Sequence, residues 1–169
     1  MQNIAADATR DASQLLDRAW AGPFGVDVPV DPVSIARSLG VDVFTANLDM
    51  GVAGLLVKRA GQDPAIYLNA NDSENRQRFT CAHELGHYIR RSGNDDEGWE
   101  YVDRRDQLSS AGTDPEERYA NGFAAQLLMP EHEVRSQAKK FDAAALAYTF
   151  GVSLEAMNNR LATLRIARD

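Results

Sequence analysis

Two histidines stand four residues apart in the segment CAHELGH, residues 81–87. The chain has three histidines in all, and two of them, His83 and His87, lie in this segment. On an α-helix four residues advance by about 400°, which places the two imidazoles about 40° apart on one face, a turn above one another. Two histidine nitrogens in this arrangement can share one metal ion, and zinc accepts such ligands readily.

The glutamate after the first histidine is suited to a different task. Glu84 lies about 100° from His83 around the helix, so it stands beside a bound ion and does not coordinate it. A carboxylate there can accept a proton from a water that attacks a peptide carbonyl and then pass it to the leaving amine. The same residues also occur on ordinary helices, where they make ordinary hydrogen bonds, so the interpretation needs a third metal ligand.

The third ligand is not the one that some zinc peptidases place just after the motif. Those enzymes have glycine three positions and histidine six positions after the second motif histidine, where this chain has Arg90 and Gly93. The other common solution is a glutamate on a later helix. The segment ERYAN predicts Glu117 for this role, with Asn121 one turn further along and able to accept from a ligand histidine.

Glu116 is the alternative ligand, and it points about 100° away from Glu117, so only one of the two can face the ion. Glu117 is favoured because Asn121 and Gln126 are expected nearer its face. Glu116 is then expected to be a favourable negative charge in the first turn. A packing stripe is expected alongside Glu117: Ala120, Phe123, Ala124 and Leu127.

Capping and periodicity predict the helices that position these residues. Candidate caps at residues 71–73 predict a helix of about 19 residues that carries both histidines and ends before Gly93. A cap at Asp114 predicts a second helix over 115–129, which carries the third ligand. Between them, the polar and aperiodic segment 92–114 is expected to be a long loop.

The rest of the chain predicts an α+β fold, with a small antiparallel sheet first and helices after it. Helices are expected over 3–20 and from Asp31 to Gly40, followed by three β-rich runs, two of which form a hairpin through RAGQDP. The runs are VDVFTANL, VAGLLVK and AIYLN. The whole chain, residues 1–169, is predicted to be a single domain.

The C-terminal part, residues 131–169, is expected to form three short helices. Its segment ALAYTFGVSLEAMNNRL has the helix, glycine-containing turn and second helix of a helix-turn-helix subdomain. Six bases and five acids make this part nearly neutral, which favours a helical pair packed on the core over a DNA-binding element.

Composition narrows the setting and the partners. The net charge is −7, and residues 92–118 hold nine acids against three arginines. This charge disfavours nucleic acid as a direct partner and suits a basic protein surface. The chain has one cysteine and no apolar run of membrane-spanning length, and its first residues do not resemble a secretion signal. We therefore expect a cytoplasmic protein without membrane association.

Several other residues permit both a functional and a structural interpretation. Cys81 lies about 200° around the helix from His83, so it is expected to be a small buried hydrophobe and not a ligand. His132 can polarise a carbonyl or orient a substrate, but an exposed position at a helix start is favoured. Three tyrosines are possible oxyanion donors or substrate contacts, with nothing to choose among them: Tyr88, Tyr101 and Tyr119.

Together, the segments RFTCAHELGHYI and ERYANGFAAQLLMP resemble the ImmA/IrrE family of zinc metallopeptidases. The similarity extends from about Asp31 through the C-terminal helices. It implies a zincin-like helical core, one Zn²⁺ per chain and Glu84 as general base. It also implies that the substrate is a helix-turn-helix repressor of the XRE type encoded nearby, whose cleavage relieves repression of stress or mobile-element genes. The zinc ligands that it implies are His83, His87 and Glu117.

Two classes of function remain open. The first is an endopeptidase that acts on a repressor, and the second is a non-catalytic module that binds a repressor or DNA and keeps the motif as a structural metal site. A structural zinc site normally has four protein ligands, whereas a catalytic one has three. The sequence supplies three, and this number favours catalysis.

Overall fold

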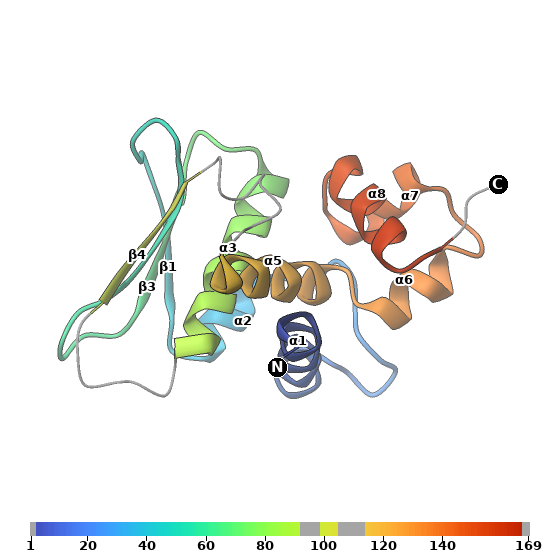
Figure 1. Ribbon diagram of the computed structural model, residues 1–169, viewed down its shortest axis with the longest axis horizontal. Coiled ribbons are helices and arrows are strands. Elements are labelled where there is room, and N and C mark those ends of the chain that lie inside the picture. The colour runs from blue at the N-terminus through green and yellow to red at the C-terminus, as the bar shows by residue number, and fades with distance from the viewer. Residues whose placement is uncertain (1–2, 92–98, 105–113, 167–169) are drawn as a thin grey trace.

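The computed structural model describes residues 3–91, 99–104 and 114–166. The helices are α1 Ile4–Ala19, α2 Pro32–Ser38, α3 Glu74–Arg91, α5 Pro115–Leu128, α6 Glu131–Gln137, α7 Ala143–Phe150 and α8 Leu154–Thr163. The strands are β1 Asp42–Ala46, β2 Val52–Lys58, β3 Ala65–Asn69 and β4 Trp99–Arg104. Figure 1 shows the sheet at one end of the molecule, α1, α2, α3 and α5 in the middle, and α6, α7 and α8 at the other end.

The helices begin where the capping residues predict. Asp31 accepts a hydrogen bond of 3.0 Å from a backbone N–H in the first turn of α2, and Asp114 does the same for α5 at 2.9 Å. The hydroxyl of Ser73 accepts from a backbone N–H in the first turn of α3 at 3.4 Å. Each cap satisfies one of the N–H groups that a helix leaves without a partner in its first turn. The predicted starts of α2, α3 and α5 are confirmed.

The α+β class is confirmed, but the sheet is mixed and not purely antiparallel. Its strand order is β1-β3-β2-β4, with β2 antiparallel to both neighbours and β1 parallel to β3. The predicted hairpin through RAGQDP joins β2 and β3. In the strand order β3 lies between β1 and β2, and β1 pairs parallel with β3, the strand after next in the chain.

The expectation of a long loop over 92–114 is wrong for its middle part. Residues 99–104 form β4, which pairs antiparallel with β2. Its sequence WEYVDR interleaves aromatic and β-branched residues with charged ones, a pattern that suits a strand at the edge of a sheet. Because the residues on either side are polar, the sequence pattern did not indicate this short strand. Residues 92–98 and 105–113 lie outside the described ranges.

Helix α3 passes through the centre of the molecule, and its middle two turns are buried. Every residue from Thr80 to His87 is buried. The sheet covers one side of α3 and α5 lies on another (Figure 1). Residues 80–87 have no face toward solvent, so their polar side chains need partners inside the protein. Within the described ranges, no helix is both long and apolar enough to cross a membrane.

Helix α1 covers another side of α5 and is joined to it by two side-chain hydrogen bonds. The hydroxyl of Tyr119 donates to Asp11 at 2.7 Å, and the amide of Gln126 donates to the hydroxyl of Ser13 at 3.0 Å. Gln126 was expected near the face of Glu117, and that expectation is wrong. Nine residues along a helix advance by about 900°, so Gln126 lies half a turn away from Glu117 and faces α1.

Helices α7 and α8 are separated by Gly151, whose φ of 62° is the left-handed conformation that ends α7. Arg78 of α3 connects this turn to the core. Its Nε donates to the carbonyl of Gly151 at 3.0 Å, and its Nη2 donates to the carbonyl of Val30 at 2.6 Å. Burial lowers the pKa of Arg78, although a guanidinium remains charged at neutral pH. One side chain of α3 therefore holds both the C-terminal helices and the segment before α2.

We predict that Arg78→Met lowers the free energy of unfolding by about 3 kcal/mol, because the carbonyls of Gly151 and Val30, and that of Phe150 at 3.5 Å, lose a charged donor. Arg37→Met is the control, since Arg37 is exposed and makes one hydrogen bond of 3.3 Å to the carbonyl of Val43. The control should lose less than about 1 kcal/mol. Urea denaturation followed by circular dichroism measures both values. Equal losses would show that Arg78 does not join the two parts.

Candidate metal centre

Helix α3 places His83 and His87 on one face, as their spacing predicts. Their Nε2 atoms are 3.0 Å apart, and the rings meet edge to face with centroids separated by 4.7 Å. The two residues are 0% and 1% exposed. Two imidazoles at this distance and depth present their Nε2 atoms to the same small volume.

Glu117 of α5 completes the group. Its Oε2 lies 3.4 Å from Nε2 of His83, and its Oε1 lies 3.3 Å from Nε2 of His87. The ligand atoms of the three residues all lie within 4.8 Å of one another. Glu116 points elsewhere, and its Oε2 accepts from Nη2 of Arg91 at 2.6 Å. Of the two candidate glutamates, the structure brings Glu117 to the histidines.

The close approach of α5 to α3 depends on a residue without a side chain. Gly86 lies between the two histidines, and a Cβ at this position would be 3.1 Å from Cα of Ala120 and 3.2 Å from a ring carbon of Phe123. Both distances are shorter than an ordinary van der Waals contact. Glycine at residue 86 therefore lets the two helix backbones come near enough for the short side chain of Glu117 to reach both imidazoles.

Asn121 fixes the tautomer of the first histidine. Its Oδ1 lies 2.9 Å from Nδ1 of His83. Because a side-chain amide oxygen can only accept, Nδ1 carries the proton, and the neutral ring presents a lone pair at Nε2. A partner of this kind also fixes the orientation of a ligand histidine. The structure thus places Asn121 as the sequence predicts.

The donor set fits a divalent cation. It consists of histidine nitrogens and a carboxylate, the ligands that zinc prefers. Two ligand atoms at zinc bond lengths of about 2.0–2.1 Å and at a tetrahedral angle are about 3.3 Å apart. The two Nε2 atoms are 3.0 Å apart, and each imidazole has one carboxylate oxygen of Glu117 close to that value, Oε2 at 3.4 Å from His83 and Oε1 at 3.3 Å from His87. A cation would also offset the cost of burying a carboxylate at a site that is 4% exposed.

Glu84 lies beside this group and is not part of it. Its side chain is 0% exposed and rests against strand β2 at Gly54, where a Cβ would be 3.0 Å from its Oε1. The position agrees with a rotation of about 100° from His83 around the helix. A buried carboxylate on the residue next to a ligand histidine is a candidate for a proton acceptor.

Two of the other candidate residues, Tyr119 and His132, have partners outside the cluster. Tyr119 is fully buried, bonded to Asp11, and covered by the guanidinium of Arg90 at 4.7 Å from its ring centroid. Burial and the hydrogen bond to Asp11 raise its pKa. The imidazole of His132 is 92% exposed and lies 3.3 Å from Glu133. Tyr88 is partly buried and packs against the core.

Two further predictions concern Cys81 and Tyr101. Cys81 is fully buried within the hydrophobic core, and burial raises its pKa to about 12, so its thiol stays protonated at neutral pH. Its predicted role as a small hydrophobe is confirmed. Tyr101 belongs to β4, but its side chain lies outside the described part of the structure.

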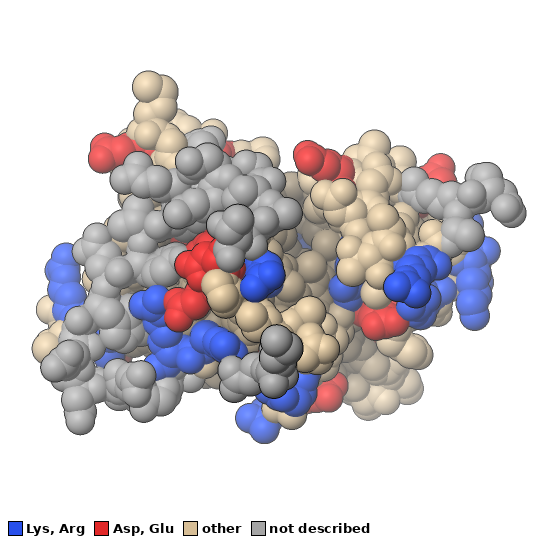
Figure 2. All heavy atoms as spheres, in the orientation of Figure 1, with Lys and Arg blue, Asp and Glu red and all other residues tan. Residues whose placement is uncertain are grey.

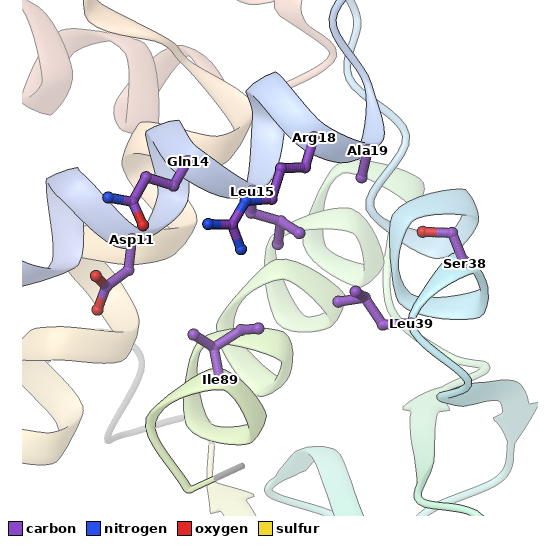
Figure 3. A pocket seen from close by; sticks show the side chains of 8 residues that line it. All are labelled: Asp11, Gln14, Leu15, Arg18, Ala19, Ser38, Leu39 and Ile89. Atoms are coloured by element: carbon purple, nitrogen blue, oxygen red, sulfur yellow. The ribbon is translucent and has the colours of Figure 1, made fainter. Parts of the chain in front are cut away.

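A separate surface pocket of about 510 Å³ lies between α1, the end of α2 and the last turns of α3. Figure 3 shows Leu15, Leu39 and Ile89 on its walls, with Asp11 and Arg18 on α1. The residues that line this pocket include none of the three cluster residues, His83, His87 and Glu117. They include neither Asn121 nor Glu84. The candidate metal centre is therefore not this pocket.

Comparison with known families identifies the class of protein. The model of a peptidase family described as the IrrE N-terminal-like domain matches residues 36–162. This match covers most of the chain, which therefore belongs to the IrrE N-terminal-like peptidase family. The resemblance inferred from the two motifs is confirmed. Membership suggests a metallopeptidase, and the cluster of two histidines and a glutamate can hold a metal ion. No curated protein matches the chain.

Two glycines of the site have no role in the predictions from sequence, although each has a recognisable signal. Gly86 interrupts a helix, where glycine costs about 1 kcal/mol relative to alanine, and such a residue often marks a close packing contact. Gly54 interrupts the β-rich run VAGLLVK, where glycine often marks a close backbone approach. Neither signal says which residue lies opposite, and only the fold supplies that partner.

We predict that the purified protein binds about one zinc per chain and that Glu117→Ala lowers its zinc affinity by more than about 100-fold. Glu116→Ala is the matched control on the neighbouring residue and should keep wild-type affinity, because its carboxylate pairs with Arg91. Elemental analysis and competition with a zinc chelator give stoichiometry and affinity. Zinc loss in the Glu116 variant with retention in the Glu117 variant would reverse the assignment.

Proposed function

We propose that this protein is a cytoplasmic, zinc-dependent endopeptidase that cleaves a repressor of the XRE type. The observation that carries the proposal is the number and arrangement of the buried groups. Two histidines and one glutamate form a set of three ligand atoms, with one further carboxylate beside them. Catalytic zinc sites have three protein ligands and leave one position for a water or a substrate, whereas structural sites normally have four.

The chain's own residues divide the work of peptide hydrolysis. His83, His87 and Glu117 would hold the ion, and Asn121 would keep the first histidine in the tautomer that binds metal. A bound zinc supplies a Lewis acid that polarises the scissile carbonyl and activates a water.

Glu84 would accept the proton of the attacking water as the new C–O bond forms. It would then deliver that proton to the amide nitrogen as the C–N bond breaks. The oxygen of the water ends on the new carboxyl group, and the delivered proton ends on the new amine. Full burial of Glu84 suits this role, because it keeps bulk water from competing for the proton.

The choice of a DNA-binding repressor rests on the family resemblance and on charge. The chain carries a net charge of −7, which favours encounters with a basic protein surface. Basic and acidic side chains are interspersed on the face shown in Figure 2, so the attraction would come from the whole chain and not from one continuous acidic patch on this face. Much of the acidic segment 92–114 lies outside the described residues.

We predict that Glu84→Gln retains zinc and the thermal stability of the wild type but lowers kcat by at least about 100-fold. The amide has nearly the same shape as the carboxylate and cannot accept the proton of the attacking water. Zinc content, thermal unfolding and cleavage rate should be measured on the same preparation. A variant that cleaves at the wild-type rate would exclude Glu84 as the general base.

The proposed activity is tested by incubating the protein with the XRE-type repressor encoded nearest to its gene. Intact-mass analysis should find two fragments from a single cut between the DNA-binding and dimerising parts. The rate should fall as salt screens the charge attraction. Chelator-treated protein and the Glu84→Gln variant are the controls, and neither should cleave. An uncut repressor that forms a complex resistant to chelation would favour a non-catalytic binding module.

A further inference from the structure

Two residues outside the ligand set lie against the side chain of Glu84. Thr80 precedes it by one helical turn on α3, and Gly54 lies opposite in strand β2. Thr80 and Glu84 are both 0% exposed, and Gly54 is buried in the sheet against them. Residues four apart share one face of a helix, so this face of α3 rests on the strand at a residue without a side chain.

The fit at this contact is too tight for any larger residue. A Cβ at Gly54 would lie 2.4 Å from Cγ2 of Thr80, 3.0 Å from Oε1 of Glu84 and 3.4 Å from its Cγ. The first distance requires that an atom move. The second is shorter than the separation of about 3.5 Å at which non-bonded atoms attract. A methyl group at residue 54 therefore competes directly with the position of the Glu84 carboxylate.

Strand β2 is less able than the side chain of Glu84 to move away from a new methyl group at residue 54. Gly54 pairs with Leu68 of β3 on one side and with Asp103 of β4 on the other, so β2 is an interior strand of the sheet. The pairing with β4 also shifts register between Val52 and Gly54, which marks an irregularity of the kind that redirects a strand locally. The carboxylate, in contrast, is the flexible end of a long side chain.

We propose that Gly54 is a positioning residue for the general base. Its missing side chain fixes where the Glu84 carboxylate rests, and the backbone of β2 limits how far that carboxylate can move from the metal centre. The catalytic consequence rests on the proposed peptidase function. The position of the carboxylate does not rest on it, and it can be measured in a protein with or without activity.

The test uses Gly54→Ala in a background that removes the larger clash. Thr80→Ser deletes Cγ2 and keeps the hydroxyl, so in the double variant the new methyl group overlaps Glu84 and no longer overlaps Thr80. Thr80→Ser alone is the reference. Gly22→Ala is the matched control for the glycine substitution, because the atoms nearest to a Cβ at Gly22 are 3.9 and 4.0 Å away.

Crystal structures of the zinc-loaded reference and double variant decide the structural part of the proposal. The Glu84 carboxylate should move by at least a few tenths of an ångström or change rotamer in the double variant. The ligand atoms of His83, His87 and Glu117 should stay in place, and zinc content should be unchanged. An unmoved carboxylate would overturn the proposal. Loss of zinc would also overturn it, since Gly54 would then support the ligands and not the base.

Kinetics decide the catalytic part. A misplacement of about 1 Å can cost about 100-fold in rate, so a shift of about 0.3 Å should lower kcat about fourfold with KM nearly unchanged. Both Thr80→Ser and Gly22→Ala should keep kcat within about twofold of the wild type. A displaced carboxylate with kcat equal to that of the reference would remove the catalytic role. If the wild type cleaves no substrate, the proposed function fails, and the crystal structures still decide where Gly54 places Glu84.

Discussion

The burial of four ionisable side chains at one place is the constraint on which the rest of the structure depends. His83, His87, Glu84 and Glu117 are all at most 4% exposed. Withdrawing such groups from water is costly unless each has a partner held in a fixed position. The helix that carries three of them must therefore be enclosed by other elements, and the sheet, α2 and α5 provide that enclosure. The glycines at 54 and 86 let two of these elements come close enough.

Local rules predicted the helices well because their signals lie within a few residues of each helix end. The caps at Asp31 and Asp114 and the turn at Gly151 are examples, since each acts on backbone groups of its own segment. The sheet was harder to predict. The parallel pairing of β1 with β3 depends on which strand is inserted between its neighbours, and β4 depends on an open edge of β2 that is distant in sequence. Information of this kind is not local.

The ligand set could be predicted because metal binding restricts both residue type and spacing. His83 and His87 are related by the helical repeat, and the choice of Glu117 over Glu116 follows from the same geometry. The surroundings of Glu84 could not be predicted in this way. Gly54 meets that side chain across some thirty residues of sequence, through a packing contact that no motif records. The expectation for Gln126 failed for a simpler reason, because its distance of nine residues from Glu117 places it half a turn away.

Helix α1 lies outside residues 36–162, which the family model matches, yet it covers one side of the helix that supplies the third ligand. Ala8 approaches Gly122 of α5 closely, since a Cβ at Gly122 would be 3.3 Å from Cβ of Ala8. A fragment that started at residue 36 would expose this small-residue side of α5 to water and would leave the hydroxyl of Tyr119 without its acceptor. The segment that the family model matches is therefore shorter than the segment that is packed into the hydrophobic core. Relatives with an unrelated N-terminal segment would need another element to shield the same surface.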